Sequence, residues 1–141
     1  MLSFDKFTFF NIVSILSICF LDAHEMVSFT GSTHSLLYDF FAKSLGKENW
    51  GYDAVGKLPV ISGLYSKFIK NRALRLNCVA QCYEELWVAV ADDDLKTDSW
   101  TKRGLSSKRK SDLEWSLLDV EAWSSDNYLE SDECRRQALL E

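Results

Sequence analysis

The stretch that decides the fold is residues 59–90, PVISGLYSKFIKNRALRLNCVAQCYEELWVAV. Its apolar residues recur every four and three positions, which places them on one face of an α-helix. That stripe contains Tyr65, Ile69, Ala73, Leu76, Ala80, Tyr83, Trp87 and Val90. The spacing predicts a long core-facing helix that Pro59 opens, because proline suits a first helical turn. A bend in this helix is expected near Asn71 and Arg72. For the apolar run 86–90, a short buried strand is the alternative to helix.

Two helices are predicted on the N-terminal side of this stretch. Residues 3–29 carry apolar side chains at helical spacing, and Gly31 is expected to end that helix. Ser32 is expected to cap a second helix that stops at Gly46. Its apolar stripe contains Leu36, Leu37, Phe40, Phe41 and Leu45. Both helices are expected to face the core.

On the C-terminal side, residues 91–111 are polar and are expected to form the longest connection. Ser111 and Glu114 match a capping box, which predicts a helix beginning there. A short helix is expected to follow Ser131. The complete pattern predicts an all-α fold, a single compact domain over residues 1–141 with about five or six helices.

Composition agrees with one folded domain. The 141 residues are 47% hydrophobic, with 13% aromatic residues, one proline and six glycines. This excludes intrinsic disorder, and the scarcity of proline and glycine argues against a β-sandwich with many turns. A net charge of −5 excludes a general polyanion-binding role.

The N-terminal segment bears on the compartment. Residues 1–23 lack a clear positive region and a small-residue cleavage site, so a cytoplasmic location is expected. The alternative is a secreted or periplasmic protein that loses this segment and has Cys78, Cys82 and Cys134 in disulfides. Free buried thiols are the preferred interpretation of the cysteines.

No catalytic or metal-binding motif is complete. Residues 51–57 resemble a phosphate-binding loop, but Leu58 replaces the hydroxyl residue that would bind magnesium. Cys78 and Cys82 lack the second ligand pair that structural zinc requires. An EF-hand loop beginning at Asp92 lacks its central glycine. We therefore expect a protein that is not an enzyme and that uses no cofactor or metal.

Charge is distributed in blocks. Residues 54–83 carry +5, residues 84–98 carry −5, residues 99–110 carry +5 and residues 111–141 carry −7. Such alternation is typical of helices that pair opposite charges across a bundle surface. It also gives a partner distinct acidic and basic faces to recognise.

These observations favour a non-enzymatic protein-binding module, most plausibly an intracellular inhibitor or immunity-type protein. Its partner is expected to be a basic-surfaced toxin or nuclease that the acidic segment covers. Tryptophans in predicted loops add candidate contacts, because such residues are enriched in binding hot spots. The candidate partner-binding residues are Asp92, Asp93, Asp94, Asp98, Trp100 and Trp50.

Two further alternatives remain open. The basic blocks 57–75 and 102–110 would suit a nucleic-acid-associated protein. An apolar stripe left over on the helix at 3–29 would suit a homodimer seam.

Overall fold

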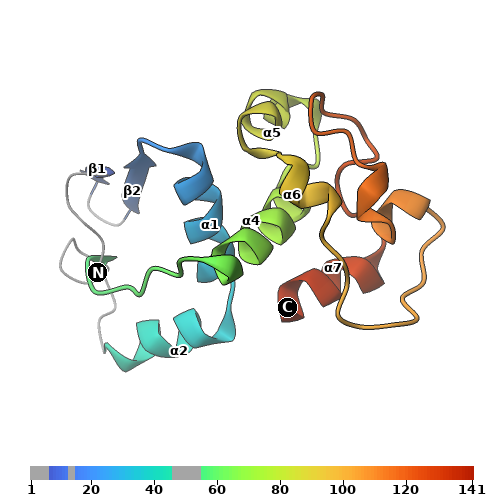
Figure 1. Cartoon of the computed structure of the whole chain (residues 1–141). Helices are drawn as coiled ribbons and strands as arrows, with labels where there is room; N and C mark the ends of the chain where they lie inside the picture. The colour runs from blue at the N-terminus through green and yellow to red at the C-terminus, as the bar shows by residue number, and fades with distance from the viewer. Residues whose placement is uncertain (1–6, 13–14, 46–54) are drawn as a thin grey trace.

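The computed structural model describes residues 7–12, 15–45 and 55–141, with side chains from residue 18 onward. The molecule is mostly helical, as predicted, and α4 runs through its middle (Figure 1). The six described α-helices are α1 (Ala23–Thr33), α2 (Leu36–Ser44), α4 (Leu64–Asn77), α5 (Glu84–Val90), α6 (Asp93–Lys96) and α7 (Asp132–Leu140). The described 3-10 helices are η2 (Gln81–Tyr83), η3 (Lys110–Asp112) and η4 (Trp115–Leu117). Among the described residues, every helix is too short or too polar to cross a membrane.

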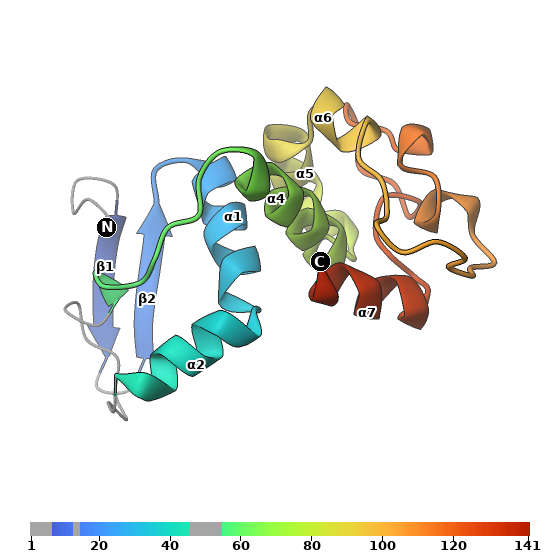
Figure 2. The ribbon, with the colours of Figure 1, turned by 60° about the horizontal axis from the view of Figure 1, so that its bottom comes forward.

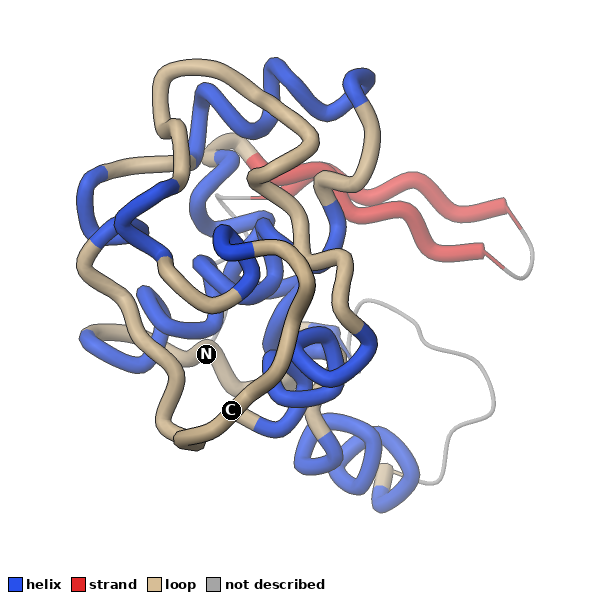
Figure 3. Tube along the Cα trace, turned by 90° about the vertical axis from the view of Figure 1, so that its right-hand side faces the viewer, coloured by secondary structure: helices blue, strands red, loops and turns tan. Residues whose placement is uncertain are grey.

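The N-terminus contains a β-hairpin. Strands β1 (Phe7–Ile12) and β2 (Ile15–Phe20) pair antiparallel, and Phe7 lies opposite Phe20. Figure 3 shows the two strands extending away from the helical body. The predicted helix over residues 3–29 is therefore wrong through this segment. Both strands are rich in phenylalanine and isoleucine, which favour a pleated backbone, and this local preference outweighs the helical spacing.

Helix α1 continues through Gly31, which was expected to end it. The reason is a close crossing with α4. A Cβ atom at Gly31 would lie 2.6 Å from Ile69 Cγ2 and 2.9 Å from Ala73 Cβ. Glycine at this position lets the two helix backbones approach each other. Asp22 caps α1 by accepting a 2.7 Å hydrogen bond from the His24 amide.

Helix α2 begins three residues later than predicted. Its N-cap is Ser35, which accepts a hydrogen bond from the Tyr38 amide at 3.2 Å. Ser32, the predicted cap, lies inside α1 and donates to the Ser28 carbonyl oxygen instead. The face of α2 that packs inward carries Tyr38 and Phe41.

The predicted long helix of residues 59–90 is divided into two helices. Helix α4 begins at Leu64 after Gly63, whose φ of 76° lies in the left-handed region, so Pro59 precedes the helix. The helix runs through the position of the expected bend and ends at Asn77. The chain then leaves helical geometry at Cys78, where ψ is 59°.

Helix α5 follows through the short η2. It covers the apolar run 86–90, so the strand alternative there is wrong and helix is confirmed. Trp87 and Val90 are fully buried, which matches their place on the predicted stripe. Tyr65, at the other end of that stripe, is 72% exposed.

The C-terminal third is built from short turns. The helix predicted from Ser111 does not form, and η3 and η4 occupy its place. Ser111 Oγ makes no hydrogen bond, so the capping box is not formed. Asp112 instead accepts hydrogen bonds from the amides of Glu130 and Ser131. The helix predicted after Ser131 is confirmed as α7.

The largest core cluster joins α4 to the C-terminal turns. It contains Val27, Ala73, Leu74, Cys78, Trp87, Val90, Leu95, Trp115 and Leu118. Arg75 is fully buried beside this cluster and donates to the carbonyl oxygens of Asn127 and Ser111, at 3.0 and 2.7 Å. Burial lowers the pKa of Arg75 to about 10. Figure 2 shows the resulting arrangement, with the hairpin, α1 and α2 on one side of α4 and α5, α6 and α7 on the other.

Candidate functional site

The predicted acidic residues face α4. Asp94 lies 2.6 Å from Lys67 Nζ, and Asp92 lies 2.6 Å from Lys70 Nζ. The hydrogen bond between Lys67 and Asp94 raises the pKa of the lysine and lowers the pKa of the aspartate. Asp93, between them, is exposed. The +5 and −5 blocks therefore neutralise each other here, as their alternation predicted.

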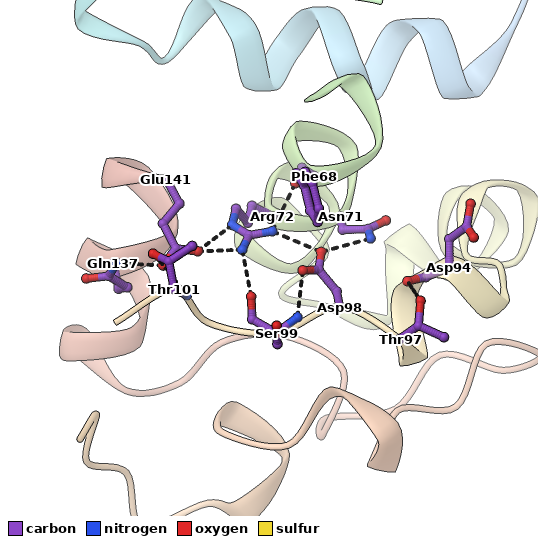
Figure 4. Close-up of polar contacts among 10 residues, drawn as sticks. All are labelled: Phe68, Asn71, Arg72, Asp94, Thr97, Asp98, Ser99, Thr101, Gln137 and Glu141. Atoms are coloured by element: carbon purple, nitrogen blue, oxygen red, sulfur yellow. Dashed lines mark hydrogen bonds and ion pairs between the residues drawn. The ribbon is translucent and has the colours of Figure 1, made fainter. Parts of the chain in front are cut away.

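Asp98 is an internal residue. Its carboxylate accepts hydrogen bonds from Arg72 Nη1 at 2.9 Å and from Asn71 Nδ2 at 3.0 Å (Figure 4). Arg72 also donates to the Ser99 carbonyl oxygen at 3.1 Å. Because the Arg72 and Asp98 side chains are only 5% and 1% exposed, Asp98 is not available to a partner.

Glu141 completes this network from the end of α7. Arg72 Nε donates to its carboxylate at 2.9 Å, and the Thr101 amide and Gln137 Nε2 donate to it at 2.9 and 2.6 Å. Burial raises the pKa of Glu141, but these hydrogen bonds outweigh burial and bring the pKa to about 2. Figure 4 shows Arg72 between the two carboxylates that hold it.

Of the two tryptophans predicted to contact a partner, the structure describes Trp100 only. Trp100 is half-buried, donates to the Asp112 carbonyl oxygen at 2.9 Å and packs against Trp115 with ring centroids 5.1 Å apart. The Trp100 ring therefore makes its main contacts inside the protein. Trp50 lies outside the described residues.

A cavity of about 520 Å³ lies between α1, α4, α6 and residues 60–63. Asp92 and Asp94 line it together with Lys67 and Lys70, so the structure brings two of the predicted residues to one site. Its remaining lining includes Phe20, His24, Glu25, Ser28, Phe29, Ser32, Tyr38, Val60, Ile61 and Ser66. Neither spacing nor composition marks this site, because it combines residues from β2, α1, α2, α4, α6 and the segment 60–63.

A second feature is the outer face of α2. Leu36, Leu37 and Phe40 are 83%, 80% and 73% exposed, although they were expected to face the core. The opposite face carries Tyr38 and Phe41 and packs inward, so α2 is apolar on both sides. That property was readable in the sequence LLYDFF, but which face would be covered was not.

Part of each basic block is engaged within the chain. In the first block, Lys67, Lys70 and Arg72 pair with acids and Arg75 is buried. In the second, Lys102 pairs with Glu133, and Arg109 with Asp126 and Glu130. Arg103, Lys108 and Lys110 of the second block are exposed, and the nucleic-acid alternative stays a prediction.

Cys78 and Cys82, the candidate metal-ligand pair, lie in different elements. Cys78 is buried after the end of α4, whereas Cys82 is exposed in η2, so the two do not share a helix face. Burial raises the pKa of the Cys78 thiol to about 11, which keeps it protonated at neutral pH. Across the described part of the chain, no three histidine, cysteine or acidic residues are grouped as metal ligands. In the loop resembling a phosphate-binding motif, residues 51–54 lie outside the described residues.

Comparisons with known family models, with curated proteins and with solved structures returned no match.

Proposed function

We propose that this chain is a non-enzymatic protein-binding module of the inhibitor or immunity type, with the outer face of α2 as its main contact surface. The supporting observation is that α2 is apolar on both faces while only one face is packed. A helix that is apolar all round is normally buried. The exposed face of Leu36, Leu37 and Phe40 therefore calls for a covering partner.

The chemistry of this face favours a protein as the partner. Within the described residues of α2, the charged side chains are Asp39 and Lys43, which form an ion pair and so add no net charge to this face. A nucleic acid requires cations, and a membrane-surface helix requires a basic polar face, which α2 lacks. An aromatic and aliphatic patch with a polar rim is typical of the centre of a protein interface.

Acidic surface elsewhere supports the expectation of a basic-surfaced partner. Residues 111–141 carry a net charge of −7. Most of their acids are exposed, including Glu114, Asp119 and Glu121. Charge of this kind accelerates association and selects orientation, while the apolar face supplies affinity. A toxin or nuclease with a basic surface, the expected partner, could be attracted by these acids and bound by the apolar face.

The test is a tagged capture from the native host at moderate salt, comparing wild type with a Leu37→Glu, Phe40→Glu double variant. The matched control is Val88→Glu with Leu117→Glu, whose side chains are 49% and 52% exposed on other elements. We expect one stoichiometric protein with wild type and control, and an affinity loss of about 30-fold or more in the α2 variant. Equal capture by the α2 variant, or recovery of only self-copies or nucleic acid, would contradict the proposal.

A further inference from the structure

We infer that the cavity between α1, α4 and α6 binds an uncharged small molecule with an apolar body. Its volume of about 520 Å³ falls within the range of small-molecule sites. Its lining comes from β2, α1, α2, α4, α6 and the segment 60–63, so several elements of the fold together form the walls. This inference does not depend on the proposed protein partner.

Part of the wall is aromatic and aliphatic. Phe20 and Phe29 line the cavity with ring centroids 5.3 Å apart, and Tyr38 meets Phe29 edge-on at 6.4 Å. Val60 and Ile61 add aliphatic surface from the segment before α4. Such walls bind an apolar body by burial and by ring contact.

Three hydroxyl groups of the lining donate within the chain. The Tyr38 hydroxyl donates to the Pro59 carbonyl oxygen. Ser32 and Ser66 each donate at 2.8 Å to a backbone carbonyl oxygen three or four residues before them. A ligand that needs these hydroxyl protons would have to displace the existing hydrogen bonds, which lowers the gain from each new one.

The lysines of the lining are paired with its aspartates. Lys70 Nζ lies 2.6 Å from Asp92, and Lys67 Nζ lies 2.6 Å from Asp94, so the charges of these four residues cancel. The second carboxylate oxygen of Asp92 makes no hydrogen bond, but it is buried and out of reach of a ligand. Glu25, the third carboxylate of the lining, also has an interaction within the molecule and is not free.

This pairing disfavours charged ligands of either sign. An anion would have to draw a lysine away from its aspartate, and a cation would have to draw an aspartate away from its lysine. Either exchange leaves one charge of the lining without its partner, and Lys70 is only 7% exposed. An uncharged molecule leaves both ion pairs intact and still buries its apolar body against the aromatic wall.

The first test is a titration of the isotope-labelled full chain at pH 7.5, followed by NMR, with three probes that share one apolar body. These are 4-phenylbutan-1-ol, 4-phenylbutylamine and 4-phenylbutyrate. We expect the alcohol to bind about fivefold tighter than the amine or the acid, as for the disturbance of one partly exposed ion pair. Shifts should centre on Ser28, Ser66 and Lys67. Absence of saturable shifts with the alcohol, or an ion that binds as tightly as the alcohol, would overturn the inference.

Filling variants separate the cavity from general surface binding. Ser28→Phe places a ring in the cavity and should weaken binding of the alcohol by about tenfold or more, a change typical of a blocked site. Thr33→Phe is the control, because Thr33 is exposed on the same helix and does not line the cavity. Ile61→Trp, outside any helix, is a second way to fill the cavity. Retained affinity for the alcohol in both folded filling variants would refute the site.

The charge argument has its own pair of variants, measured at low salt. Lys67→Met leaves Asp94 without its lysine and should raise the affinity for the amine at least to that for the alcohol. Asp94→Asn should do the same for the acid. Lys43→Met is the control, because it breaks an ion pair on α2 that does not line the cavity, and it should leave all three affinities unchanged.

Circular dichroism and the unfolding temperature verify that each variant is folded. If the alcohol keeps its fivefold advantage in both Lys67→Met and Asp94→Asn, the ion pairs do not select an uncharged ligand, and the class of ligand assigned to the cavity is wrong.

Discussion

Two groups of ion pairs on α4 use the same kinds of residue but differ in how far they are exposed to water. Lys67 and Asp94 meet at the surface, with side chains 54% and 47% exposed. Arg72 and Asp98, from the same two parts of the chain, meet in the interior at 5% and 1%. Depth separates them, because water screens the first pair and is excluded from the second. The outer pairs border a cavity, and the inner network holds the C-terminal helix to α4.

The largest expected effect is the loss of the inner cation. Arg72→Met keeps much of the side-chain volume but leaves Asp98 and Glu141 buried without their cation. We expect the free energy of unfolding to fall by about 3–5 kcal/mol, the usual cost of breaking a buried ion pair. Urea denaturation monitored by circular dichroism measures it. A fall in the free energy of unfolding of less than about 1 kcal/mol would mean that the buried ion pair contributes no more than an exposed one.

The next effect depends on pH through Glu141. Its pKa falls from 4.5 to about 2 on folding. The ionised carboxylate therefore stabilises the fold above pH 4.5, and this stabilisation is lost as pH falls toward 2. Glu141→Gln should cost about 2–3 kcal/mol at pH 6 and clearly less at pH 3. Urea denaturation of both proteins at each pH measures this difference, and a gap of equal size at both values would contradict the assignment.

Lys70 is an intermediate case, since its side chain is 7% exposed while that of Asp92 is 40% exposed. Lys70→Met should reduce the free energy of unfolding by about 1–2 kcal/mol, because Asp92 keeps access to water after losing its partner. Chemical denaturation under the conditions used for Arg72→Met gives the comparison. A loss as large as that of Arg72→Met would mean that partner exposure does not govern these energies.

The smallest effect is expected at the surface. Lys67→Met should change the free energy of unfolding by less than about 1 kcal/mol, and added salt should reduce the difference further. The measurement is urea denaturation at low and high salt. A larger, salt-independent loss would show that Lys67 has an internal role.

Some of this architecture followed from local pattern. The helical class, the helix over 86–90 and the helix after Ser131 follow from spacing and capping residues. The charge blocks predicted pairing of opposite charges across the bundle surface, and the ion pairs of Lys67 and Lys70 agree with that. These blocks did not indicate how deeply each side chain is buried. Asp98 was therefore expected at a partner surface, although its side chain lies in the interior.

Other features depend on tertiary contacts that spacing does not encode. Local preference places Gly31 at the end of a helix, and its close crossing with Ile69 explains why it lies inside α1. Ser111 matched a capping box, but Asp112 binds the backbone that precedes α7 and holds this segment in short turns. The face of α2 that remains exposed was likewise set by the packing of Tyr38 and Phe41.

Because α4 engages Asp92, Asp94 and Asp98, we propose α2 as the partner-binding surface. The most direct test places a photo-crosslinking amino acid at Phe40 or, for comparison, at the exposed Asp93, and irradiates cells of the native host. We expect the Phe40 position to crosslink one partner protein and the Asp93 position to give little or none. Crosslinking of that partner through Asp93 alone, or of Phe40 only to copies of this chain, would contradict the proposed role of α2.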